Sequence, residues 1–148
     1  MANQPRVQTR VYVSEEVGDL YNLLTAEGKR ETADPVQSPF SKYKDVFLTA
    51  ACLGFQLQWR KPLPKGDKKR EIRLDTFREN EVDILKAIAI AETGGVDVLL
   101  DMGEVLTIAE EFAYSGVREL EMRLLKTNGQ PLWNLVSLIQ SETDASKS

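Results

Sequence analysis

One stretch, Ser38 to Trp59, most constrains what this chain can fold into. Its centre, Val46 to Phe55, is ten residues long and carries no charged side chain. Apolar residues recur there at helical spacing, and further apolar residues occupy the opposite face. A helix that is apolar nearly all round is buried on all sides. We therefore expect a mainly α-helical fold with a short N-terminal strand, in which a helical bundle packs around a buried central helix at about residues 39–58.

Composition limits what can surround this helix. With 148 residues, of which 42% are hydrophobic, the chain can bury one core, so we expect a single domain over residues 1–140. Small Ala50, Ala51 and Gly54 would let a neighbouring helix or a partner chain approach closely. The chain has no histidine and one cysteine, which removes the usual general base and any internal disulfide. Cys52 lies in the apolar run, where a thiol acts as a small core residue.

The N-terminal part predicts a strand and then a helix. Residues 7–13 alternate, with valines on one side and Gln8, Arg10 and Tyr12 on the other, which is typical of a half-buried strand. Ser14 stands where an N-cap belongs and two glutamates follow it, so a helix is expected to begin there. A polar loop comes next, and Ser38-Pro39 is a suitable cap and first position for the central helix.

This order of strand, helix, loop and helix is similar to the ribbon-helix-helix arrangement. In that fold two chains pair their strands, and outward side chains of the ribbon read bases in the major groove. Gln8, Arg10 and Tyr12 would hold that position, and Gln and Arg make bidentate contacts to bases. Strand-mediated dimerisation without DNA and a plain edge strand are the alternatives. A lone short strand has too little pairing to be stable, so we expect a homodimer or a larger oligomer.

The most basic stretch is a predicted exposed loop over residues 60–73. Two prolines and a Gly-Asp pair impose turns in it, and residues 71–74 are suited to a second short strand. Seven cations in this stretch are candidates for contact with DNA phosphates, the alternative being a solvated hairpin tip: Arg60, Lys61, Lys65, Lys68, Lys69, Arg70 and Arg73.

Charge divides the chain into two halves. Up to Arg73 there are 13 Lys and Arg against 9 Asp and Glu, whereas from Leu74 onward there are 6 against 14. Such a division is compatible with a nucleic-acid face on one half and a protein-docking face on the other. The acidic half has helical patterning at about residues 76–92, 104–126 and 131–140. Its last residues, 141–148, are polar and are expected to be a disordered tail.

Candidates for catalysis are few. The acid pairs Glu110-Glu111 and Asp97 with Asp101 resemble those that hold Mg2+ in nucleases, but carboxylates are frequent throughout this half and solvated helix faces explain them better. No phosphate-binding glycine-rich loop is present. We therefore expect a protein that is not an enzyme and uses no cofactor. The N-terminus lacks the apolar stretch of a signal peptide and no run is long enough to span a membrane, so we expect a cytoplasmic protein.

Four segments together resemble a known family. They are FSKYKDVFLTAACLGFQLQWRKPL, EIRLDTF, ILKAIAIAETGGVDVLL and IAEEFAYSGVRELEMRL, which occur in this order from Phe40 to Leu125. They are similar to small accessory proteins associated with DNA phosphorothioation, in the Dnd modification and restriction systems of bacteria. The most specific pieces are the run that ends at Leu53-Gly54-Phe55 and the segment Glu110 to Gly116.

This resemblance implies a bacterial defence accessory that works with other Dnd-system proteins. The leading hypothesis is a non-enzymatic subunit that binds DNA, through the basic loop, or assembles a complex. The first alternative is a dimeric DNA-binding transcriptional regulator of the ribbon-helix-helix type. A metal-dependent nuclease is the third.

Overall fold

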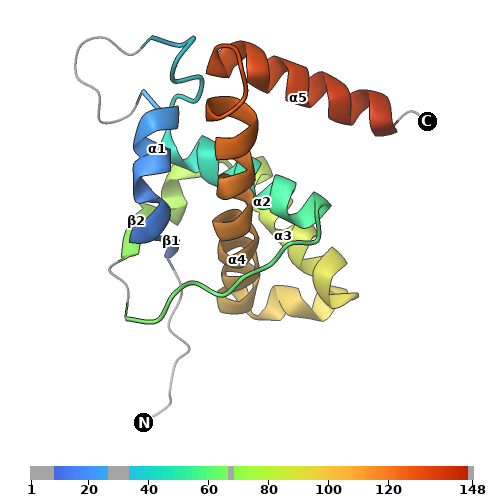
Figure 1. Ribbon diagram of the computed structural model, residues 1–148. Helices are drawn as coiled ribbons and strands as arrows, with labels where there is room; N and C mark the ends of the chain where they lie inside the picture. The colour runs from blue at the N-terminus through green and yellow to red at the C-terminus, as the bar shows by residue number, and fades with distance from the viewer. Residues whose placement is uncertain (1–8, 27–33, 67–68, 147–148) are drawn as a thin grey trace.

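The computed structural model describes residues 9–26, 34–66 and 69–146, with side chains described up to Ser141. Its elements are β1 (Arg10–Ser14), η1 (Glu15–Val17), α1 (Gly18–Leu24), α2 (Tyr43–Gln56), β2 (Lys69–Arg73), η2 (Leu74–Thr76), α3 (Glu79–Thr93), η3 (Val96–Leu100), α4 (Met102–Leu120), η4 (Glu121–Leu125) and α5 (Pro131–Ser146). Figure 1 shows their arrangement around α4. The predicted fold class, mainly α-helical with a short N-terminal strand, is confirmed. None of the helices in these ranges is long and apolar enough to cross a membrane.

Helices α2 and α4 cross at the centre of the molecule. A Cβ atom added to Gly54 would lie 2.1 Å from the carbonyl oxygen of Phe112, and one added to Gly116 would lie 1.8 Å from that of Ala50. No side chain fits in such a space, so both glycines are required for this approach. The prediction that small residues let another helix approach is confirmed.

Helix α2 is central but not enclosed. Val46, Phe47, Ala50 and Ala51 are fully buried. Cys52, however, is exposed, so the expectation of a core thiol is wrong. Packing against α3 and α4 leaves one side of α2 open to solvent.

The start of α2 also differs from the expectation. The helix begins at Tyr43, not near residue 39, because the preceding chain pairs with the end of α1. Phe40 receives a backbone hydrogen bond from Ala26 at 3.0 Å and donates one to Leu24 at 3.1 Å, which holds it outside a helix. The hydroxyl of Ser38 donates to the carbonyl of Leu23 at 2.9 Å instead of capping α2.

Strand β1 pairs with a strand of the same chain. Its antiparallel partner is β2, in a register that places Val11 opposite Ile72 and Arg10 opposite Arg73. Val11 and Val13 are buried and Arg10 is exposed, so the predicted alternation is confirmed within the described residues. The strand spans Arg10–Ser14 where residues 7–13 were expected, and residues 1–8 lie outside the described part. Since β2 supplies the pairing, a second copy is not needed to stabilise β1.

The acidic half is helical, with boundaries close to those expected. Gly94, at φ 82°, ends α3 in the left-handed region, and the carboxylate of Asp101 accepts from the N–H of Glu104 at the start of α4. The largest difference lies at the C-terminus, where α5 continues to Ser146. The expected disordered tail is therefore helical up to that residue, because no glycine or proline follows Pro131 to stop the helix.

Candidate functional site

The basic stretch that the sequence predicts as one loop, residues 60–73, has two parts. The first belongs to an extended segment, residues 57–66, which passes over α4 (Figure 1) and which we call the strap. The N–H of Lys61 donates to the carbonyl of Glu111 at 3.4 Å, so the strap lies on α4. The second part, Lys69–Arg73, is strand β2. The predicted loop over residues 60–73 therefore ends earlier than expected, and the second short strand expected at residues 71–74 is present, beginning two residues earlier, at Lys69.

Arg60 attaches the strap to two helices. Its Nε atom lies 2.6 Å from Oε1 of Glu111, and its Nη1 atom lies 3.5 Å from Oε1 of Glu92. A third carboxylate, that of Glu104, lies 4.0 Å from Nη2. The guanidinium is therefore surrounded by carboxylates from α3 and α4, and its charge is already compensated within the chain.

The other arginines of the predicted DNA-binding set are also paired. Arg70 makes two hydrogen bonds to Glu15, at 3.1 and 3.2 Å. Arg73 pairs with Asp75 at 2.6 Å, and Arg10 pairs with Glu71 at 2.8 Å. A phosphate would have to compete with these carboxylates, which lowers the gain from each contact.

The lysines of the set are more accessible. Lys61, Lys65 and Lys69 are exposed, and none of the described carboxylates forms an ion pair with Lys65. The ammonium of Lys61 lies 6.0 Å from the centroid of the Trp59 ring. Lys68, like Gln8 of the predicted base-reading strand, lies outside the described residues. The structure thus separates the set into paired arginines and accessible lysines.

One edge of β1 is covered by a carboxylate that the sequence did not single out for this role. The N–H of Tyr12 donates to Oε2 of Glu110 on α4 at 2.9 Å. β2 occupies the other edge of β1. A ribbon formed with a second copy through β1 would have to displace one of these two neighbours.

Burial changes the acid–base behaviour of Glu110. The side chain is 8% exposed, and this burial raises the pKa of the carboxyl to about 7, against the opposing effect of the Tyr12 N–H. Glu111 raises the pKa further and Lys69 lowers it. Glu110 therefore titrates near neutral pH, although it lies in a hydrogen bond that favours its charged form.

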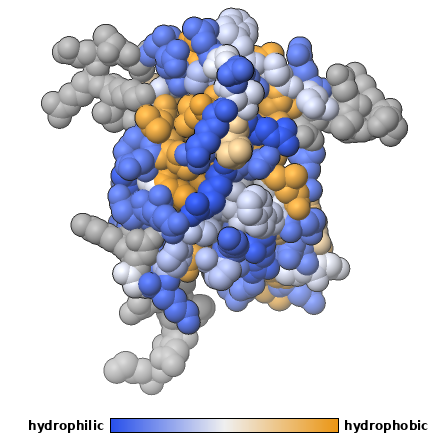
Figure 2. Space-filling model, in the orientation of Figure 1, coloured by the Kyte–Doolittle hydropathy of each residue, from blue (hydrophilic) through white to orange (hydrophobic). Residues whose placement is uncertain are grey.

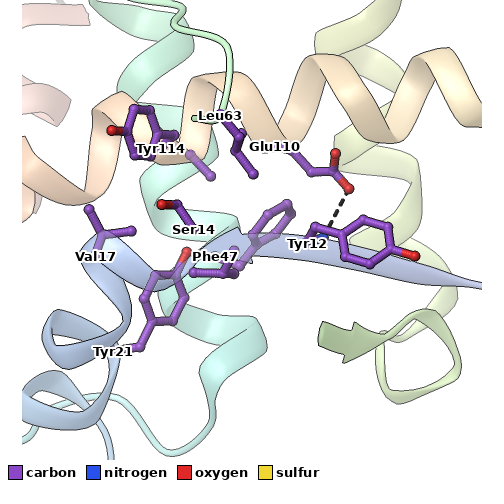
Figure 3. A pocket seen from close by; sticks show the side chains of 10 residues that line it. Tyr12, Ser14, Val17, Tyr21, Phe47, Leu63, Glu110 and Tyr114 are labelled. Carbon is purple, nitrogen blue, oxygen red and sulfur yellow. Dashed lines mark hydrogen bonds between the residues drawn. The ribbon is translucent and has the colours of Figure 1, made fainter. Parts of the chain in front are cut away.

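The surroundings of Glu110 form a packed joint. Figure 3 shows the joint from close by, with residues contributed by β1, η1, α1, α2, the strap and α4. The hydrogen bond between Tyr12 and Glu110 is drawn as a dashed line. The side chains leave no room between them for a water-sized molecule. This joint connects the two-stranded sheet of β1 and β2, which we call the ribbon, to the helices and does not form a ligand pocket.

The paired acids considered for a metal site do not converge. The carboxylate of Glu110 accepts a hydrogen bond from Tyr12, and that of Glu111 accepts one from Arg60. Asp101 caps α4, and Asp97 is exposed on η3. Among the described residues no three carboxylate or thiol groups are placed to hold one ion.

The role of Glu110 has a recognisable signal in the sequence. Glu110 follows Leu106 by four residues and precedes Tyr114 by four, and both are buried on α4. A helical projection would therefore place this carboxyl on a buried face. The partner of Arg60 has no such signal, since Arg60 and Glu111 are separated by 51 residues.

The chain was also compared with known proteins. No curated protein and no solved structure matches it. A family model does match, over residues 10–148, and its description is DNA sulphur modification system-associated protein 4. This model covers all the described elements from β1 to α5, so the chain belongs to the family of DNA sulphur modification system-associated protein 4.

Proposed function

We propose that this protein is a non-enzymatic accessory subunit of a bacterial Dnd system, and that it assembles a complex by binding other proteins of the system. One observation carries the proposal: large apolar side chains remain on the surface while the arginines assigned to DNA are paired internally. Leu100 is 90% exposed, Val96 is 64% exposed and Trp133 is 58% exposed. Val96 and Leu100 lie together on η3, and neighbouring exposed apolar groups mark protein interaction sites. Figure 2 shows further apolar residues that reach the surface between polar ones.

The absence of an enzymatic role is part of this proposal. It is supported by the contacts of two carboxylates considered for catalysis. Glu110 accepts from the N–H of Tyr12 on β1, and Glu111 accepts from Arg60 on the strap. Both side chains act as structural acceptors. Their positions follow from the fold and require no substrate.

Co-expression tests the assembly role. The tagged protein is produced together with each of the other proteins of the same Dnd system, purified at moderate salt and analysed by sedimentation. We expect a complex of defined stoichiometry with at least one of these proteins. Recovery of the tagged protein alone from every pairing would contradict the proposal.

Contact with DNA is a second candidate, through the accessible lysines of the strap. Lys61 and Lys65 are exposed and lie on either side of Pro62 and Pro64 in the strap, which suits contact with a phosphate backbone. Binding of this kind tolerates any sequence and weakens with salt, each lost phosphate contact removing about 0.9 from the log-log slope. Arg10 and Tyr12 are less suited to base reading, because Arg10 already pairs with Glu71 at 2.8 Å.

A salt titration of duplex DNA binding tests this candidate. Lys61→Gln combined with Lys65→Gln is expected to flatten the slope, whereas the matched pair Lys42→Gln and Lys126→Gln, away from the strap, is expected to leave it unchanged. Equal slopes for the two double variants would contradict a strap contact. A footprint on one discrete sequence, lost with Arg10→Ala, would instead support the ribbon-helix-helix regulator.

A further inference from the structure

A surface at the junction of α3 and α4 combines exposed apolar groups with acids. We call it the η3 corner and define it by Val96, Asp97, Leu100, Asp101 and Glu104. Val96 and Leu100 are the two most exposed large apolar side chains among the described residues. Figure 1 shows η3 as the short turn between α3 and α4, away from the ribbon. An open hollow of about 450 Å³ lies beside it, lined by residues 93–95 and by Asp97, Val98, Asp101 and Glu104.

The backbone holds the η3 corner in place. Gly94 closes α3 through a hydrogen bond to Ile90 at 2.8 Å, and the N–H of Asp101 donates to the carbonyl of Val98 at 3.0 Å. Val98 and Leu99 pack against the core from the same element. Leu100 is therefore presented outward by a fixed turn, so its exposure does not arise from a loose chain end. Burying such a side chain is favourable, a gain that the isolated chain leaves unused.

The charge around this turn has one sign. From Ala87 to Val117 the sequence contains six acidic residues and no Lys or Arg. Asp97 and Asp101 are exposed, and no cation of the described ranges forms an ion pair with either. Glu92, Glu104 and Glu111, at the side facing the strap, accept the guanidinium of Arg60. Arg60 therefore compensates the acids on the side that faces the strap, with Glu104 of the η3 corner 4.0 Å from its Nη2 atom, and leaves Asp97 and Asp101 to a cation from a partner.

We propose that the η3 corner is a docking site for a polypeptide segment of another protein, in which Lys or Arg side chains alternate with apolar ones. The apolar groups would cover Leu100 and Val96, and the cations would meet Asp97 and Asp101. The inference rests on the assembly role proposed above. DNA is an unsuitable occupant because phosphates are repelled by the acids.

A second copy of this chain could not readily meet the site with its arginines. The arginines of its ribbon already form ion pairs, Arg10 with Glu71, Arg70 with Glu15 and Arg73 with Asp75. They would have to leave carboxylates of their own chain to reach those of a neighbour. The exposed lysines of the strap, Lys61 and Lys65, are the cations that a second copy could offer, and that occupant is an outcome of the experiment below. We assign the site to a different protein because the inference rests on the assembly role.

A labelled peptide of alternating leucine and arginine tests the site directly, with a peptide of alternating leucine and glutamate as the control probe. We expect the cationic peptide alone to bind, and Leu100→Ser and Asp97→Lys each to weaken it about tenfold, a loss of about 1.4 kcal/mol. The matched variants are Leu23→Ser on α1, where the side chain is 52% exposed, and Asp83→Lys near the start of α3. Both should bind as the wild type does. Equal affinity of all variants, or binding of both peptides, would overturn the inference.

The same variants in the co-expression experiment separate this inference from the assembly role. Loss of the complex with Leu100→Ser and Asp97→Lys, but not with Leu23→Ser and Asp83→Lys, supports docking at the η3 corner. A complex that survives all four substitutions leaves the assembly role standing and overturns the docking site. A wild-type dimer that Leu100→Ser converts to a monomer would make a second copy the occupant and overturn the choice of partner.

Discussion

Helix α4 makes two different kinds of contact along its length. Toward α2 it packs backbone against backbone, at Gly54 and Gly116. Toward β1 and the strap it presents carboxylates, with Glu110 bound to Tyr12 and Glu111 bound to Arg60. The first contact depends on shape and the second on charge. Changes of pH or salt therefore act on the attachment of the ribbon and the strap more than on the crossing of the helices.

The two contacts also differ in how they tolerate change. A close-packed crossing has no spare volume, so a single added methyl group must displace a backbone. A hydrogen bond to a carboxylate can be replaced by a neutral acceptor of the same shape. The four predictions that follow test this difference, from the largest expected effect to the smallest.

Gly116→Ala should produce the largest loss of stability. The added Cβ atom would lie 1.8 Å from the carbonyl oxygen of Ala50, so α2 and α4 must separate, at a cost of about 3 kcal/mol or more. Gly95→Ala is the matched control, because a Cβ atom there meets nothing within 4 Å. Urea unfolding measures both. Wild-type stability of Gly116→Ala would show that the helices do not cross as described.

Glu110→Gln should stabilise the protein above neutral pH. The folded-state pKa, about 7, is raised above the ordinary value of 4.5, so the folded state holds a proton that the unfolded state releases. The stability from this group is present below pH 4.5 and is lost as the pH rises through 7. Since one pKa unit equals about 1.4 kcal/mol, the wild type loses on the order of 3 kcal/mol by pH 8.

Glutamine keeps an acceptor for the Tyr12 N–H but has no charge to desolvate. Unfolding curves of the wild type and of Glu110→Gln should therefore agree near pH 4.5 and diverge toward pH 8, with the variant more stable. Parallel pH profiles would contradict the burial of a titrating Glu110.

Arg60→Ala should loosen the strap with a smaller effect on global stability. Partly exposed ion pairs contribute about 1 kcal/mol or less each, and Arg60 contacts three carboxylates. Hydrogen exchange of the Lys61 amide should become faster, and high salt should reproduce part of the change. Arg73→Ala is the control, because its ion pair with Asp75 joins exposed side chains two residues apart. Unchanged exchange in Arg60→Ala would mean that the backbone alone holds the strap.

Ser115→Ala should give the smallest effect, a slight gain. The Ser115 hydroxyl is buried on α4 and finds no hydrogen-bond partner among the described residues. Removing an unsatisfied buried hydroxyl gains about 1 kcal/mol or less. Thr49→Ala is the contrasting variant, since its hydroxyl donates to the carbonyl of Asp45 at 2.9 Å. Thermal unfolding should move upward for Ser115→Ala and not for Thr49→Ala.

The sequence predicts the helical centre well because its signals are local. The apolar run and the small residues of α2 are visible without knowing any partner. The start of α2 was misplaced because the pairing of Phe40 with the end of α1 is a tertiary contact. The second strand was expected at residues 71–74, and its bounds differ, Lys69–Arg73, because its pairing with β1 is also a tertiary contact.

The candidate site was harder to predict because a cationic residue in the sequence is not necessarily free to bind DNA. Arg60, Arg70 and Arg73 count as three cations in the sequence. Carboxylates distant along the chain compensate Arg60 and Arg70, whereas Arg73 pairs with Asp75, two residues away. Glu110 was interpreted as part of a solvated helix face, although its spacing from Leu106 and Tyr114 indicates a buried one; its partner, the N–H of Tyr12, lies on a distant strand. The lysines of the strap remain a prediction.

Strand β1 lies far in the sequence from the residues that it contacts in space, and this has a consequence for biosynthesis. Arg10 meets Glu71, 61 residues later, and Tyr12 meets Glu110, 98 residues later. During translation β1 therefore leaves the ribosome long before either partner exists, and closing such long loops delays folding. We expect the nascent N-terminal segment to remain without its sheet, and open to chaperones and proteases, until α4 has emerged and the domain folds in one late step.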